Sequence, residues 1–169
     1  MATAYSKIQR NFWETDEARE MTPEEKYFWM YLQTNANVNT LGCYAFRMRK
    51  AMDETGYNRE TLEKLLQRME QVLRILYDEG TKEVFLLHWA EGNWNKKTAT
   101  LRALAADLKE IQSKTLKETV KTLLLKNGIF TEEEVEKAEK TAPSAQERNE
   151  KEQRGTTGNK WSGEGEGEG

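Results

Sequence analysis

The stretch ETGYNRETLEKLL, residues 54–66, decides the fold expected for this chain of 169 residues. Gly56 is a residue type that ends helices, and Asn58 is one that caps the start of the next helix. Two helices joined by the three residues 56–58 form a helix-turn-helix. The apolar residues of the second helix fall on one face, as core-facing residues should; they are Leu62, Leu65, Leu66 and Met69.

A β-hairpin is predicted directly after the second helix. Residues 73–77 and 83–87 are rich in apolar and β-forming residues, and a turn segment containing Gly80 separates them. A hairpin in this position is a wing. We expect its strands to pair with a short strand at 41–46, which gives a small antiparallel sheet.

A capped helix is predicted before the helix-turn-helix. Thr22 can cap it, Pro23 suits its first position and Glu25 completes a capping box. The helix should run through Leu32. Upstream of it, residues 7–13 are compatible with a short strand or an extended arm.

Three further helices are predicted after Thr98, where apolar residues recur at helical spacing. One stripe is Leu101, Leu104, Leu108 and Ile111, and a second is Leu116, Val120, Leu123 and Leu124. The third helix should start at Thr131, with Glu134 in capping-box register. Beyond Pro143 the composition predicts a disordered acidic tail that ends in alternating Gly and Glu.

The expected fold is therefore mainly α with a small antiparallel sheet: a winged helix-turn-helix, a helical extension and a disordered tail. We place the winged-helix domain at 1–96, the extension at 97–142 and the tail at 143–169.

The net charge of −3 argues mildly against nucleic acid as a partner, but the acidity is concentrated at the C-terminus. Residues 131–169 hold 6 basic and 11 acidic residues, whereas residues 1–100 hold 14 and 15. Basic patches are thus compatible with the upstream sequence. The single cysteine rules out an intrachain disulfide, and no apolar run approaches the roughly 20 residues that span a bilayer. We expect a cytoplasmic protein with no membrane partner.

Several segments together resemble a known family. They are Lys7-Ile8-Gln9 with Phe12-Trp13, residues 21–28, residues 54–66, and Thr81-Lys82-Glu83 with Trp89. Over about residues 5–125 the chain resembles phage replisome organizer proteins, whose N-terminal domain is similar to the winged helix of DnaD primosomal proteins. The resemblance implies a replication initiator that binds duplex origin DNA in a bacterial host cell and helps recruit host replisome or helicase-loading proteins. The family usually has a glycine between the third helix and the wing, where this chain has Gln71-Val72-Leu73.

Candidate base contacts lie on the outward face of the second helix, which enters the major groove in helix-turn-helix proteins. We expect Lys64 and Gln67 to reach base edges, because these residue types pair with guanine and adenine. The competing interpretation is a solvated face with an i, i+4 ion pair between Glu60 and Lys64. Further candidates at the start and edge of this helix are Asn58, Arg59, Thr61 and Arg68.

Candidate phosphate contacts lie on the first helix of the motif and on the wing. They are Arg47, Arg49 and Lys50 on the helix, and Arg74 and Lys82 on or beside the wing. The alternative for the three residues of the helix is that they are ordinary solvated surface charges. For Lys82 the alternative is a charge that protects an edge strand.

Catalytic motifs are missing from the sequence. There is no phosphate-binding loop or dinucleotide fingerprint, and His88 is the only histidine. We therefore expect that the protein is not an enzyme and has no cofactor or metal site. Cys43 is expected to be a buried small residue. Two other functions remain open: a winged-helix transcriptional regulator, and an adaptor whose winged helix binds protein.

Self-association is predicted from the helix at Tyr27–Leu32, which is apolar or aromatic all the way round. We expect Tyr27, Trp29 and Met30 to be covered. The cover is either the Leu101–Ile111 stripe or a second copy of the chain in a homodimer or higher oligomer.

Overall fold

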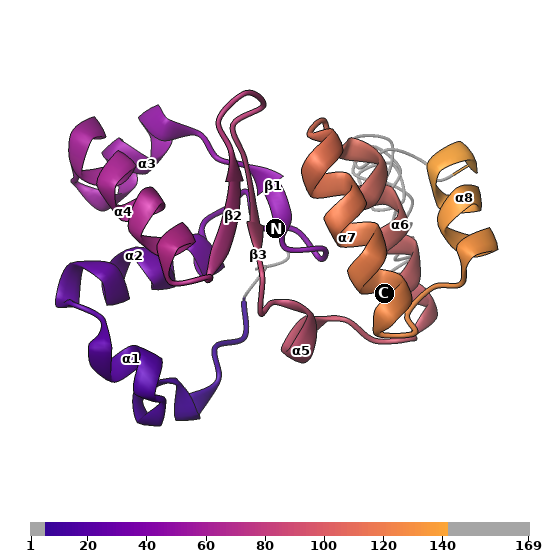
Figure 1. Cartoon of the computed structure of the whole chain (residues 1–169), viewed down its shortest axis with the longest axis horizontal. Helices are drawn as coiled ribbons and strands as arrows, with labels where there is room; N and C mark the ends of the chain where they lie inside the picture. Colours follow the sequence, from indigo (N-terminus) through magenta and orange to yellow (C-terminus); the bar gives the residue numbers. More distant parts are fainter. Residues whose placement is uncertain (1–5, 142–169) are drawn as a thin grey trace, which may run out of the picture.

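The computed structural model describes residues 6–141. The chain is mainly helical with a small antiparallel sheet, which confirms the predicted fold class (Figure 1). The predicted tail lies outside the described residues. In order, the elements are η1 (Arg10–Glu14), α1 (Asp16–Glu20), α2 (Pro23–Thr34), β1 (Cys43–Ala45), α3 (Met48–Thr55), α4 (Arg59–Gln71), β2 (Ile75–Asp78), β3 (Glu83–Leu86), α5 (Ala90–Asn93), α6 (Thr98–Glu110), α7 (Lys114–Lys126) and α8 (Glu132–Thr141).

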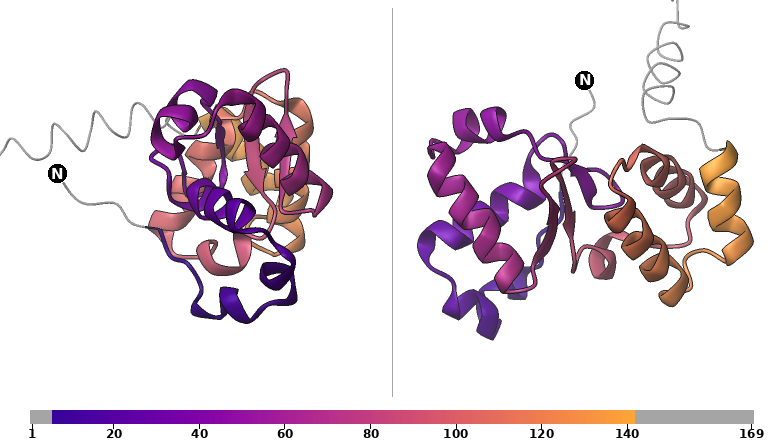
Figure 2. Two further views of the ribbon diagram at one scale, coloured as in Figure 1. Left: turned by 90° about the vertical axis from the view of Figure 1, so that its left-hand side faces the viewer. Right: turned by 45° about the horizontal axis from the view of Figure 1, so that its top comes forward.

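The sheet divides the molecule into two helical layers. Its strand order is β1-β3-β2, and both pairings are antiparallel, with Phe85 opposite both Cys43 and Leu76. Helices α1–α4 lie on one side of the sheet, and α6–α8 lie on the other (Figures 1 and 2). The central strand β3 is consequently buried along its whole length.

Local sequence explains the helix-turn-helix. Gly56 adopts the left-handed conformation (φ 79°) that ends α3, and a side chain would be strained there. The Asn58 side chain then accepts a hydrogen bond from the backbone N–H of Thr61, 2.9 Å away, and so caps α4. The predicted turn of three residues is confirmed, and so is the wing formed by β2 and β3. The four apolar residues of α4 are buried.

The other predicted caps are also confirmed. Thr22 and Glu25 form a reciprocal capping box at the start of α2. Thr131 and Glu134 do the same at α8. Residues 6–9 lie in no helix or strand and continue into the 3-10 helix η1, where Phe12 is buried. Of the two alternatives predicted for 7–13, the strand does not form; residues 6–9 fit the extended arm, and η1 follows from Arg10.

The helical extension shares one continuous core with the winged helix-turn-helix. Two buried carboxylates join the layers. Asp107 of α6 accepts a hydrogen bond from the backbone N–H of Leu41 at 3.2 Å. Glu83 of β3 accepts hydrogen bonds from the backbone N–H groups that open α7. The boundary predicted at 96/97 is thus not a break between separately packed units.

Candidate nucleic-acid interface

The outward face of α4 is exposed as predicted, but its lysine is paired. Glu60, Lys64, Gln67 and Gln71 are all exposed. The ammonium of Lys64 lies 2.7 Å from a carboxylate oxygen of Glu60, so the ion pair of the competing interpretation is present. The hydrogen bond and the charge of Lys64 lower the pKa of Glu60. Any base contact by Lys64 must compete with this partner.

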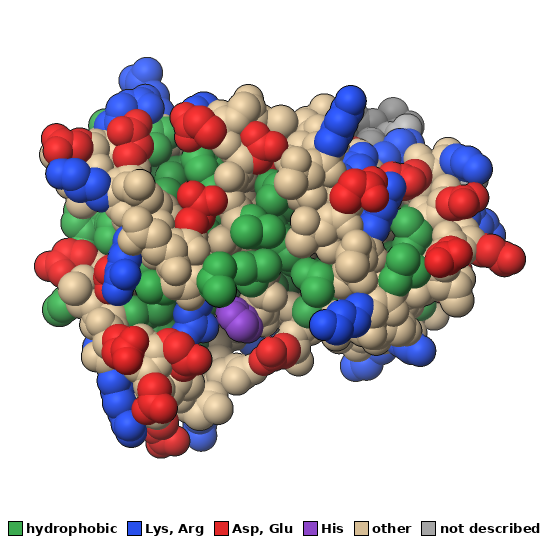
Figure 3. Space-filling model, in the orientation of Figure 1, with side chains coloured by type: hydrophobic (Ala, Val, Ile, Leu, Met, Phe, Trp, Pro, Cys, Tyr) green, Lys and Arg blue, Asp and Glu red, His purple; other side chains and the backbone are tan. Residues whose placement is uncertain are grey.

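Most other predicted DNA-contacting cations are paired in the same way. The Lys50–Glu54 and Arg59–Glu63 pairs span one helical turn at 3.7 and 3.6 Å, and Lys82 at the wing pairs with Glu79. Exposed pairs of this kind stabilise the fold by only about 0.3–0.5 kcal/mol each. Their main effect is to neutralise the surface, and Figure 3 shows acidic and basic side chains interspersed over the α1–α4 layer.

Arg47 and Arg49 differ from the other cations of the interface. Both are exposed at the start of α3, and neither forms an ion pair with any residue in the range 6–141. They are the best-placed phosphate contacts. Gln67 is likewise exposed, and its side chain makes no hydrogen bond within the same range.

A shallow groove of about 150 Å³ separates α4 from the wing. Arg59, Gln67 and Lys82 line it, so the structure brings these predicted contacts together. Three carboxylates that sequence analysis did not select line it as well; they are Glu63, Glu70 and Glu79. Tyr77 also lines the groove; burial, followed by nearby carboxylates, raises its pKa to about 12. Glu63 could have been predicted from the sequence, because it lies four residues after Arg59 on the same helix and can pair with it.

Asn58, Thr61 and Arg68 have structural roles. The side-chain oxygen of Asn58 is used in the cap of α4, and Thr61 provides the capped N–H. The guanidinium of Arg68 lies 2.8 Å from the buried carboxylate of Glu25, which ties α4 to α2. Removing Arg68 would leave the buried carboxylate of Glu25 without its cation and with only the Thr22 backbone N–H as a partner, so the pair ties Arg68 to the core.

Arg74 lies away from the interface, which corrects its predicted role. It stands at the foot of β2, at the opposite end of the hairpin from the turn that carries Lys82 (Figure 1). Its side chain is only 13% exposed and pairs with Glu17 at 3.6 Å. It lies in a pocket formed by the N-terminal segment and not on the wing surface.

Trp29 is covered within the chain, and not by either of the two covers predicted from the sequence. Trp29 is only 5% exposed, because the N-terminal segment and the Arg74 guanidinium, 5.7 Å from the ring centroid, cover it. The Leu101–Ile111 stripe is not the cover either, since α6 packs on the other side of the sheet (Figure 2). Met30 is half-buried. Tyr27 is 47% exposed and packs edge-on against Tyr57 at 5.8 Å.

Other chemistry is limited within residues 6–141. Cys43 is buried, and burial raises the pKa of its thiol far above the ordinary value. No cluster of three or more metal-ligating side chains occurs in this range. None of its helices is long and apolar enough to cross a membrane.

Comparison with protein-family models, with curated proteins and with solved structures found no match.

Proposed function

We propose that this protein binds duplex DNA through α4 and the wing, and that it acts by binding, as a replication initiator or replisome organizer in a bacterial host cell. One observation carries the proposal. The helix-turn-helix and hairpin present the exposed Gln67 on α4 and Lys82 on the wing. They also present Arg47 and Arg49 at the start of α3, which have no ion-pair partner within residues 6–141. In winged-helix proteins these positions face the major groove and the phosphate backbone. The sequence resemblance supplies the replication context.

Arg47 and Arg49 carry most of the electrostatic attraction in this proposal. Two phosphate contacts correspond to a log–log salt slope of about −1.8, since each neutralised phosphate contributes about −0.9. Breaking the helix ion pairs to free Lys50, Arg59 and Lys64 would steepen the slope. Binding without sequence preference should therefore be weak, and base contacts by Gln67 should account for much of the discrimination.

The proposal is tested by selecting a site from a random duplex library and measuring anisotropy on the selected site and a scrambled duplex. Gln67→Ala should weaken the selected site by about 1–3 kcal/mol and leave the scrambled duplex unchanged. Arg49→Ala should weaken both equally and reduce the salt slope by about 1. Arg19→Ala is the matched control, because Arg19 is exposed on α1 and paired with Asp16.

An outcome in which the triple variant Arg47→Ala, Arg49→Ala, Gln67→Ala binds DNA like the wild type would disprove this interface. If the selected sites lie at promoters and not at an origin, the transcriptional-regulator alternative replaces the initiator. Immunoprecipitation of bound DNA from infected cells makes that distinction.

An adaptor that binds protein is the second candidate, and the paired charges favour it. Ion pairs or a buried carboxylate engage every predicted interface cation except Arg47 and Arg49 within the described chain. An adaptor should show no duplex binding at all at about 50 mM salt, the condition at which phosphate contacts are strongest.

A further inference from the structure

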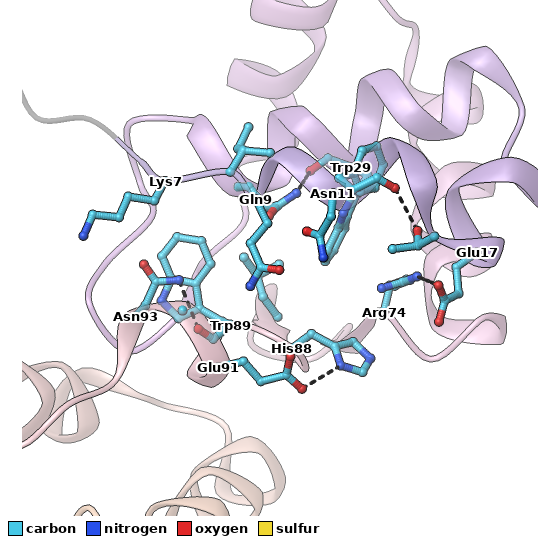
Figure 4. Close-up of a pocket in the computed structure, with 16 residues that line it drawn as sticks. Lys7, Gln9, Asn11, Glu17, Trp29, Arg74, His88, Trp89, Glu91 and Asn93 are labelled. Atoms are coloured by element: carbon cyan, nitrogen blue, oxygen red, sulfur yellow. Dashed lines mark hydrogen bonds and ion pairs between the residues drawn. The ribbon is translucent and has the colours of Figure 1, made fainter.

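A pocket lies at the end of the hairpin opposite the wing tip. The N-terminal segment closes it against α2, the foot of the hairpin and α5 (Figure 4). Its volume is about 540 Å³, which falls within the usual range for ligand sites. Most of its lining residues are polar; five are apolar, namely the exposed Ile8 and the buried Phe12, Trp29, Leu86 and Trp89.

The Trp89 wall is rigidly held. Its indole N–H donates to the carbonyl of Thr40 at 3.0 Å. Its ring packs against Gly42, where a Cβ would come within 2.4 Å of the ring. Only glycine is compatible with this contact, so the wall belongs to the folded framework and is formed before any ligand binds.

Arg74 is the main charged group in the pocket. Its side chain is only 13% exposed, and its guanidinium stacks over the Trp29 ring. A guanidinium has five N–H donors, yet within residues 6–141 this one makes no hydrogen bond and has only the 3.6 Å ion pair with Glu17. The Glu17 side chain is 64% exposed, so little holds it in place. A better-placed acceptor in the pocket would satisfy the donors that Glu17 leaves unused.

Gln9 and Asn11 add further hydrogen-bonding capacity. Their side-chain amides point into the same space as the Arg74 guanidinium (Figure 4), and neither makes a hydrogen bond within the described chain. His88 lines the same pocket, and its Nδ1 lies 3.9 Å from a carboxylate oxygen of Glu91, too far for a hydrogen bond. The pocket therefore offers donors and acceptors around one partly buried cation.

The charge of the pocket selects among possible ligands. Glu17 and Glu91 line it together with Arg74 and Lys7, so the lining is balanced and not strongly positive. A phosphodiester chain, with a charge on every nucleotide, would meet both carboxylates. A single carboxylate matches the one partly buried guanidinium, because the two can form a bidentate pair. Ile8 and the accessible edges of Trp29 and Trp89 favour apolar groups on either side of that carboxylate.

We propose that this pocket binds a short peptide segment of a partner protein, in which one acidic side chain is flanked by apolar residues. The ligand carboxylate takes the place of Glu17 on Arg74, and the flanking groups pack against Ile8 and the accessible edges of Trp29 and Trp89. The site lies at the opposite end of the hairpin from Lys82, so a partner can occupy it while α4 and the wing hold DNA. It does not depend on DNA binding.

The test is an NMR titration of the full chain, without DNA, with acetyl-Leu-Glu-Leu-amide. We expect saturable shifts of the Trp89 indole N–H and the Arg74 Nε–H signals. The matched peptide acetyl-Leu-Gln-Leu-amide should bind at least about tenfold more weakly, because it lacks the charge that pairs with Arg74. Equal binding of the two peptides would overturn the proposal.

Two variants separate recognition from folding. Arg74→Gln should abolish binding, but it also removes the contact with Trp29. Glu17→Gln removes the competing carboxylate from an exposed position, so it should tighten the acidic peptide by about threefold or more. The control is Glu20→Gln, an exposed carboxylate in the same helix that does not line the pocket. An unchanged affinity for Glu17→Gln would contradict the proposed replacement of Glu17 by the ligand carboxylate on Arg74.

Two further probes decide between occupants. A thymidine oligonucleotide that shifts the same signals while the peptide does not would assign the pocket to nucleic acid and refute the proposal. The peptide Gly-Glu-Gly-Glu-Gly, taken from the end of this chain, should bind poorly because it lacks apolar groups. If it bound as tightly as the acidic Leu peptide, the chain's own terminus would be the occupant and the partner assignment would fail.

Discussion

Replacing Glu83 with alanine should destabilise the whole described fold, not only one strand. Glu83 is 5% exposed on the central strand. Its carboxylate accepts hydrogen bonds from the backbone N–H of Gln112 at 3.0 Å and of Ser113 at 2.7 Å. These two groups open α7, where unpaired N–H groups and the helix dipole both favour a negative charge. Glu83→Ala leaves the N–H groups of the buried Ser113 and of the exposed Gln112 without that partner.

The size of the effect follows from these contacts. Hydrogen bonds to a charged group contribute about 1.5–3 kcal/mol each, so losing two should cost about 3–6 kcal/mol of the free energy of unfolding. Glu83→Gln keeps one acceptor oxygen and should cost about half as much, by the same reasoning. Glu79→Ala is the matched control, because Glu79 is an exposed carboxylate in the same hairpin and its loss should cost less than about 0.5 kcal/mol.

Urea unfolding followed by tryptophan fluorescence and by circular dichroism measures these differences. We expect one coincident transition for the wild type, since both helical layers share a core and the buried Glu83 links them. A loss below about 1 kcal/mol for Glu83→Ala would refute the assigned role of the carboxylate. If the circular dichroism of the wild type showed a second transition, at a different urea concentration from the fluorescence transition, the single cooperative unit would be refuted.

Two further predictions concern the hairpin. Leu73 has a φ of 53°, which is strained for a side chain, and it is 67% exposed. Leu73→Gly should therefore raise the free energy of unfolding by about 0.5–1 kcal/mol. A lower free energy of unfolding for the variant, measured in urea, would contradict this. Hydrogen bonds from the Ser113 hydroxyl and from backbone N–H groups of the turn lower the pKa of Asp78 below its ordinary 3.8. The stability that Asp78 contributes is therefore present above pH 3.8 and is lost as the pH falls through the lower folded pKa. Asp78→Asn should reduce the fall of the melting temperature between about pH 5 and 2. If the melting temperature of the variant fell with pH as steeply as that of the wild type, this role of Asp78 would be wrong.

Local signals in the sequence predicted most of the fold. The caps at Thr22, Asn58 and Thr131 and the stop at Gly56 each depend on side chains within four residues, so they can be read without knowing the tertiary structure. Helical periodicity likewise identified the buried face of α4. The ion pairs one turn apart, such as Glu60–Lys64, belong to the same local class.

Contacts between distant residues explain what the sequence did not reveal. The partner of Arg68 is Glu25, 43 residues earlier, and no spacing rule connects them. Trp29 is covered by Arg74 and the N-terminal segment, whereas the sequence offered only α6 or a second chain as covers. The groove between α4 and the wing was the least predictable part, because Glu63, Glu70 and Glu79 line it together only once these two elements pack.

The paired cations bear on which partner suits α4 and the wing. An acidic protein and a phosphate backbone must both displace the same carboxylates from Lys50, Arg59 and Lys64. Duplex DNA has a compensating gain that a protein lacks, since each neutralised phosphate releases a condensed counterion. The gain from counterion release is largest at low salt and falls as the salt concentration rises. Salt also screens the ion pairs on the protein surface, so the carboxylates become easier to displace. Duplex binding should therefore be strongest at low salt, with a slope between the value for two phosphates and the value for five, or about −1.8 to −4.5. The absence of duplex binding even at low salt would instead favour the adaptor.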